Sequence, residues 1–127
     1  SAFLPLIRRG EAEFVSLQYK DDAAEVAEFE RAHGIKVRRL PWVTQGADMD
    51  LLVSLIAALD EVISVGTAAA HFASAVGIPT TILVNRGLGW AFARDELMWY
   101  PPSTRLWRKN IGESWRDCVN RLVEARK

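Results

Sequence analysis

The sequence has 127 residues, enough for one domain with a hydrophobic core, and it is half apolar and one quarter charged, as ordinary soluble globular proteins are. Sixteen basic residues balance sixteen acidic ones, which disfavours nucleic acid as the main partner because no basic field would attract it. The single cysteine, Cys118, excludes an internal disulfide and fits a reducing compartment such as the cytoplasm.

No segment predicts a membrane span or a signal peptide. The first ten residues carry their charges after the apolar run, and the longest apolar stretch, residues 67–84, contains His71 and a Gly-Ile-Pro break. Because the chain lacks an initiator methionine and opens within an element, we expect it to be a piece of a longer polypeptide.

The first third of the chain predicts a helix, a strand and a second helix. Residues 3–8 have the pattern of a helix end, and residues 14–19 form a short β-rich run. A helical pattern begins at Asp21 and ends at His33 and Gly34, where glycine is the expected terminator.

The middle of the chain continues this alternation. Apolar and basic residues alternate over 35–40, which predicts a strand with one solvated face, and residues 41–46 are expected to form a loop. Asp48 is a suitable cap for an amphipathic helix that runs through Leu59.

Residues 61–85 are the most informative stretch. They predict a strand over 61–65, a turn at Gly66 and Thr67, a helix of small residues over 67–76 and a strand over 80–84. Both strands are nearly all apolar, as strands buried on both faces are.

The rest of the chain predicts a loop, a strand and a closing helix. Residues 85–103 are rich in loop signals, residues 105–108 form a short strand, and residues 114–126 form an amphipathic helix capped by Ser114. Helices thus alternate with strands, which predicts a three-layer α/β/α fold of Rossmann-like type with a mainly parallel sheet, in a single lobe over residues 1–127.

Polar residues are expected at the carboxyl edge of this sheet, where open α/β folds bind ligands. Thr67 begins a helix whose free N–H groups suit a phosphate, so its hydroxyl either caps the helix, holds a diphosphate, or does both. His71 shares its helix face and either donates to a phosphate or sugar or is satisfied within the fold.

Two further segments are predicted at the same edge. Gln18 and Lys20 follow the first strand, and Lys20 either neutralises a phosphate or is simply solvated. Arg86 and Trp90 follow the strand over 80–84, in a segment that is either a ligand loop or a mobile one. The segment around Tyr100 is expected to anchor this loop rather than to line a pocket.

The sequence offers no sign of a metal or cofactor. No second His or Cys lies at ligand spacing from His71, and no Gly-x-Gly-x-x-Gly, Walker or Gly-x-Ser-x-Gly motif is present. Carboxylates such as Asp95 and Glu96 are not marked as an acid–base pair, so catalytic residues are not assigned.

Several segments of the chain resemble a known family. The run Val-Ile-Ser-Val-Gly-Thr-Ala-Ala-Ala-His-Phe-Ala-Ser-Ala-Val-Gly-Ile-Pro over residues 62–79 is similar to the nucleotide-sugar-binding segment of GT-B glycosyltransferases of the heptosyltransferase type. Together with residues 14–18, residues 55–60 and the Trp99-Tyr100-Pro101 segment followed by Arg105-Leu106, it looks like the C-terminal portion of bacterial tetratricopeptide-repeat proteins that end in such a domain.

This resemblance implies the C-terminal lobe of a GT-B fold without its first strand, which binds a nucleotide-diphosphate sugar beside an N-terminal lobe and helical repeats. Thr67 and His71 match donor-contacting positions of the family. Gly66 stands where the family usually has Asp, and Ala68 where it often has Gly. We therefore expect either a donor-binding domain or an inactive, transferase-like scaffold; a nucleotide-binding regulatory domain is a weaker third hypothesis.

Overall fold

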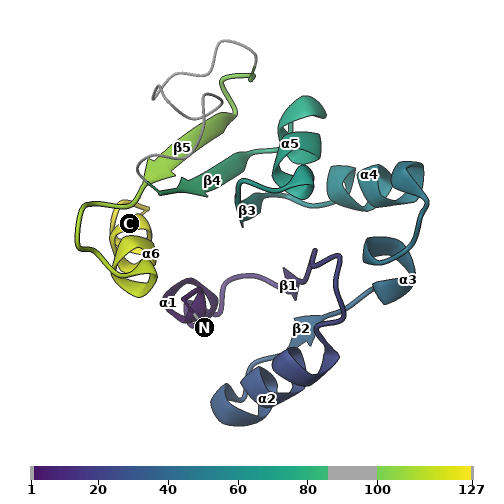
Figure 1. The fold of residues 1–127 in the computed structure, drawn as a ribbon. Coiled ribbons are helices and arrows are strands. Elements are labelled where there is room, and N and C mark those ends of the chain that lie inside the picture. Colours follow the sequence, from purple (N-terminus) through teal and green to yellow (C-terminus); the bar gives the residue numbers. More distant parts are fainter. Residues whose placement is uncertain (1, 86–99, 127) are drawn as a thin grey trace. The chain divides into compact units, whose positions relative to one another are not determined.

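The computed structural model describes residues 2–85 and 100–126, and it divides the chain into two compact units (Figure 1). Unit 1 comprises Ser1–Met49 and Trp115–Lys127, and unit 2 comprises Asp50–Ser114. A single lobe over the whole chain stays a prediction, and the two units are described one after the other.

Unit 1 contains four helices and two strands among its described residues. Their bounds are Leu4–Ile7 (α1), Phe14–Val15 (β1), Ala23–His33 (α2), Val37–Arg38 (β2), Pro41–Thr44 (α3) and Trp115–Glu124 (α6). The expected loop at residues 41–46 is wrong in part, because Pro41 begins the helix α3. Proline suits this first helical position, where its fixed φ is helical and its missing N–H is not needed.

The apolar core of unit 1 forms where α1 packs against α6. Leu4 and Leu6 of α1 are buried, and on α6 the side chains of Cys118, Val119 and Leu122 recur at helical spacing and are fully buried. Cys118 therefore acts as a small apolar core residue, as its position in the helical pattern predicts.

The strands β1 and β2 pair in parallel, with Phe14 opposite Val37 and Val15 opposite Arg38. Both are shorter than the runs over 14–19 and 35–40 that the sequence marks as β-rich. α2 connects them, and it ends at Gly34, whose φ of 66° is left-handed. A glycine at this position lets the chain turn from the helix into β2 without a Cβ clash.

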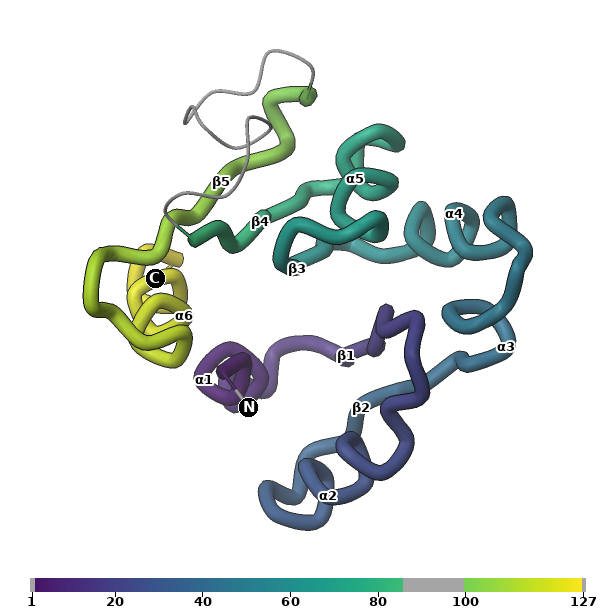
Figure 2. Tube along the Cα trace, in the orientation of Figure 1, coloured from purple at the N-terminus to yellow at the C-terminus, as the bar shows by residue number. Residues whose placement is uncertain are grey.

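Unit 2 contains a three-stranded parallel sheet and two helices among its described residues (Figure 2). The bounds are Met49–Ala57 (α4), Val62–Val65 (β3), Ala68–Ala75 (α5), Thr80–Val84 (β4) and Thr104–Arg108 (β5). The strand order is β3-β4-β5, with Val62 opposite Thr80 and Thr80 opposite Thr104.

The small residues of α5 allow it to pack closely on β3 and β4. Ala70, Ala73 and Ser74 are fully buried, and the Ser74 hydroxyl is satisfied by donating to the Ala70 carbonyl at 2.8 Å. The chain leaves this helix through Gly77, whose φ is 82°, and enters β4 at the sheet centre.

Two expectations about the sheet need correction. The alternation predicts one parallel sheet, whereas the described strands form two separate parallel sheets, β1-β2 and β3-β4-β5. Burial on both faces is confirmed for β4, which is buried along its length, but is wrong for β3, where Val65 is 43% exposed. The fold class that the structure shows is α/β with parallel strands.

Within residues 2–85 and 100–126, every helix is too short or too polar to cross a bilayer.

Candidate functional site

Thr67 lies at the turn between the carboxyl end of β3 and the start of α5, as the sequence predicts. Its backbone is extended, with φ −118° and ψ 167°, and its N–H donates to the Val65 carbonyl at 2.7 Å. The turn after β3 is therefore tight, and it presents the first residues of α5 at the carboxyl end of a parallel strand.

The Thr67 side chain does not cap α5, which corrects one of its two expected roles. No side-chain capping hydrogen bond is made at this helix start. The Thr67 hydroxyl is instead hydrogen-bonded to the hydroxyl of Ser64, three residues earlier, at 3.0 Å. Whichever of the two hydroxyls donates, the other keeps its own O–H for a further hydrogen bond.

Gly66 and Ala68 flank Thr67 and are both exposed. Gly66 does not have a positive φ, so its backbone does not require glycine. Residue 66 therefore brings no side-chain charge to the start of α5. An anion at the helix start therefore meets less repulsion than it would beside a carboxylate.

His71 lies one turn into α5 and is half-buried. The backbone N–H of His71 donates to the Thr67 carbonyl at 3.2 Å. The centre of its ring lies 5.6 Å from the centre of the Tyr100 ring, and the two rings are tilted by 33°. Tyr100 also packs against the core cluster of Ala70, Ile82 and Val84. Tyr100 thus packs on the sheet, while most of the loop that it is expected to anchor lies outside the described residues, so its anchoring role stays a prediction.

Gln18 and Lys20 lie in the segment after β1 and are exposed. The Lys20 ammonium sits 5.6 Å from the centre of the Tyr19 ring, and the Lys20 carbonyl accepts a hydrogen bond from Gln45 at 2.9 Å. β1 and β3 belong to different sheets and different units, so sheet topology does not place Gln18 and Lys20 beside Thr67 as expected.

Arg86, Trp90, Asp95, Glu96 and Trp99 lie outside the described residues, so the predicted loop after β4 is not compared with the structure.

Sequence reasoning missed a buried carboxylate in unit 1. Asp22 is only 8% exposed, and it accepts hydrogen bonds from the Ser16 hydroxyl at 2.5 Å and from Arg39 Nε at 2.7 Å. Burial alone would raise the pKa of Asp22, but the hydrogen bonds from Ser16 and Arg39 and the positive charge of Arg39 outweigh it and hold this pKa below its ordinary value. Ser16 directly follows β1 and Arg39 directly follows β2, so the pairing of these strands brings both residues to Asp22.

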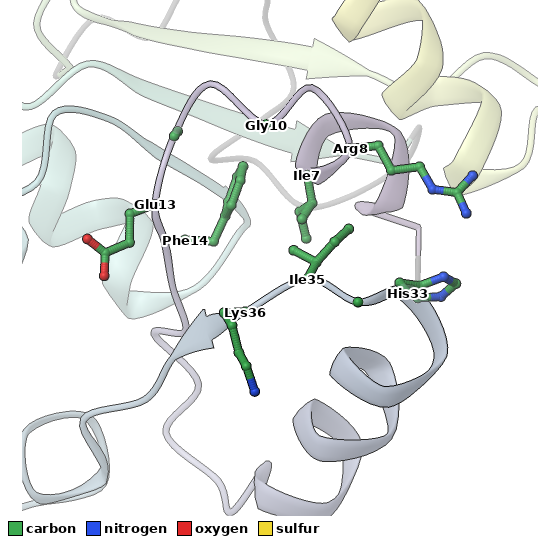
Figure 3. A pocket seen from close by; sticks show the side chains of 10 residues that line it. Ile7, Arg8, Gly10, Glu13, Phe14, His33, Ile35 and Lys36 are labelled. Carbon is green, nitrogen blue, oxygen red and sulfur yellow. The ribbon is translucent and has the colours of Figure 1, made fainter.

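Unit 1 has a hollow of about 470 Å³, which is lined by residues that precede β1 and β2 in the chain. Figure 3 shows Ile7, Phe14 and Ile35 directed toward this space, whereas Glu13 and Lys36 extend away from it. It lies at the amino ends of the two strands and is lined by none of the predicted site residues. Ligands of open α/β sheets bind at the carboxyl ends, so we do not assign the donor to this hollow.

Among the residues that the structure describes, no group of three His, Cys, Asp or Glu side chains could hold a metal ion.

The chain is similar to a known protein over most of its length. Protein FlbA of Caulobacter vibrioides is 28% identical to this chain over 121 residues, which cover 95% of the chain and 20% of FlbA. No protein-family model and no solved structure matches. The chain thus spans about one fifth of FlbA, and at 95% coverage the similarity includes residues of both units.

Proposed function

We propose that this chain is the donor-binding domain of a glycosyltransferase-like protein, with a Rossmann-like architecture of the GT-B C-terminal type. The observation that best supports this function is the junction at Thr67. There a parallel strand passes through a tight turn into a helix of eight residues whose start carries no side-chain cap. Such a junction is a common binding site for the phosphates of a nucleotide.

The ligand that fits this chemistry is a nucleotide-diphosphate sugar. Glycosyl transfer releases a nucleoside diphosphate, so the site must stabilise negative charge that develops on the leaving group. The N–H groups and dipole at the start of α5 supply part of this stabilisation, and the Thr67 hydroxyl and His71 supply hydrogen bonds. Arg86, which follows β4 in the sequence, is the proposed countercharge, and the acceptor and its general base are proposed to lie outside this domain.

A second function deserves testing because of Gly66. The family that the sequence resembles usually carries Asp at this position, and the hydroxyl that should hold the donor is already bonded to Ser64. Both observations favour a scaffold that has lost its transferase activity and serves as an interaction module beside helical repeats. The two proposals differ in whether the domain binds a nucleotide at all.

Titration of the 127-residue protein with uridine, guanosine and adenosine diphosphates and their sugar conjugates distinguishes the two functions. For the donor-binding domain we expect amide chemical-shift changes at residues 66–71 with at least one nucleotide. Thr67→Ala should weaken that binding about tenfold to hundredfold, since a hydrogen bond to a charged group contributes roughly 1.5–3 kcal/mol.

Thr104→Ala is the matched control, because it removes the same hydroxyl from the same unit at a position without a hydrogen-bond partner among the described residues. It should bind as the parent does. If no nucleotide shifts these amides at millimolar concentration, the donor-binding proposal is wrong and the scaffold is favoured.

A further inference from the structure

The hollow of about 470 Å³ in unit 1 is lined by apolar side chains that the fold of this unit leaves partly uncovered. Ile7 is the last residue of α1, Phe14 is the first residue of β1, and Ile35 precedes β2; all three are half-buried. Figure 3 shows these side chains directed toward the same space. Small-molecule sites are concave and mostly apolar, with volumes of roughly 300–1,000 Å³, so this hollow has the size and lining of a ligand site.

The charged side chains at the hollow differ in whether they already have a partner. Glu13 is paired with Arg38, and Lys36 is paired with Glu30 at 3.3 Å. The exposed side chain of Arg8, in contrast, makes no ion pair or hydrogen bond with the residues that the structure describes. One guanidinium is therefore available at a hollow where the neighbouring ammonium and carboxylate are compensated.

The polar and apolar groups of the hollow are also separated in space. Figure 3 shows Arg8 and His33 on one side of the three apolar side chains and Glu13 on the other. The His33 ring packs on Phe29, with ring centres 4.8 Å apart. A guanidinium presents its N–H donors as a planar fork that matches the two oxygens of a carboxylate. The hollow thus suits a ligand that has an apolar body and one anionic group at its end.

We propose that this hollow binds a small apolar carboxylic acid, whose carboxylate pairs with Arg8 and whose hydrocarbon part lies against Ile7, Phe14 and Ile35. A ligand with a single negative charge is favoured because a single guanidinium lines the hollow without a carboxylate partner among the described residues. The site belongs wholly to unit 1 and shares no residue with the donor site proposed at the start of α5, so it does not depend on nucleotide binding.

Titration of the 127-residue protein with 3-phenylpropionate, followed in ¹H–¹⁵N spectra, tests the site. We expect saturable amide shifts at residues 7–14 and 33–36 with a Kd of about 1 mM, as is usual for a ligand of this size. The uncharged 3-phenylpropan-1-ol and the ring-less acetate should each bind at least about fivefold more weakly. 3-Phenylpropylammonium should not bind, because it places a positive charge beside Arg8.

Substitutions then locate the carboxylate. Arg8 also lines a smaller hollow of about 250 Å³ together with Arg116 and Asn120, and the Arg116 side chain likewise makes no ion pair with described residues. Arg116→Gln is the matched control, because it removes the same charge from an exposed arginine of the same unit that does not line the larger hollow. Arg8→Gln should raise the Kd for 3-phenylpropionate about tenfold, and Arg116→Gln should change it less than about threefold.

Ile35→Ala tests the apolar wall and should raise the Kd about threefold to tenfold, because part of the buried hydrocarbon contact is lost. Absence of saturable shifts with 3-phenylpropionate, or equal binding of the alcohol, acetate or the ammonium compound, overturns the proposal. The same holds if Arg116→Gln weakens binding as much as Arg8→Gln does, or if Ile35→Ala leaves the Kd unchanged. The ligand series is measured on the parent protein, so it decides the question even if a variant fails to fold by circular dichroism.

Discussion

The structural role of a single residue in this chain is predicted best where a particular backbone conformation requires that residue type. Gly34 is such a position: the sequence marks it as the end of a helix, and the structure gives it a left-handed φ of 66° with its N–H bonded to the Glu30 carbonyl at 2.8 Å. The Glu30 side chain then accepts the Val37 N–H, also at 2.8 Å. The turn thus connects α2 directly to β2.

Gly34→Ala should destabilise the protein by about 1 kcal/mol, because a Cβ disfavours the left-handed conformation even where no neighbouring atom lies within 4 Å. Gly34→Asn should destabilise it less, since asparagine tolerates this conformation better. Urea denaturation of both variants measures the difference. Equal stability of the alanine variant and the parent would show that the turn does not hold this backbone conformation.

Thr67 shows the limit of prediction at this scale. Its place at the start of α5 follows from the sequence, but the role of its hydroxyl does not. A threonine before a helix usually caps it, whereas here a serine three residues earlier offers a competing partner at 3.0 Å. Asp22 was missed for a similar reason, because its partners Ser16 and Arg39 are brought to it by strand pairing that no local pattern encodes.

At the scale of elements, an apolar run predicts that a strand is present, but it does not predict where that strand lies in the sheet. β4 is the central strand of its sheet and is buried along its length, as expected. β3 has the same apolar character, yet it lies at an edge of the described sheet and leaves Val65 exposed. The position of a strand in its sheet depends on long-range pairing, which cannot be predicted from the composition of that strand alone.

Because β4 is buried and β3 lies at an edge, truncations of side chains in the two strands should change the free energy of unfolding by different amounts. Ile82→Ala in β4 should destabilise the protein by about 2–5 kcal/mol, because Ile82 is fully buried and the lost volume leaves a cavity. Val65→Ala in β3 is the control and should change the free energy of unfolding by less than about 1 kcal/mol, since Val65 is 43% exposed. Thermal unfolding of both variants, followed by circular dichroism, tests the ranking, and a larger loss at Val65 would contradict it.

Over the whole molecule, the alternation of helices and strands predicts parallel pairing, and this is confirmed in both sheets. The number of sheets is not predicted. Strands that follow one another often lie side by side, but this tendency does not say whether β1 and β3 share a sheet. Because β1 and β3 belong to different sheets, the structure gives no reason to group Gln18 and Lys20 with Thr67, and the site is proposed at the start of α5.

The two units should also differ in their response to acid. Asp22 and Glu30 both belong to unit 1, and both have a pKa below the ordinary values of 3.8 and 4.5. For Glu30 the hydrogen bond from the Val37 N–H lowers the pKa most; burial opposes this, and Lys36 lowers it further. Asp22 is paired with Arg39, which also contacts Asp21, and Glu30 is paired with Lys36.

A carboxylate whose pKa is lower in the folded protein adds stability above its unfolded pKa and loses it as the pH falls through the folded value. We therefore expect unit 1 to lose its amide signals first as the pH falls below about 4, over residues 14–39, while signals from residues 62–84 persist to lower pH. A pH series of ¹H–¹⁵N spectra measures this order. Asp22→Asn should flatten the acid dependence at residues 14–39, because its side chain no longer titrates, and simultaneous loss of both regions in the parent would contradict a separate response of unit 1.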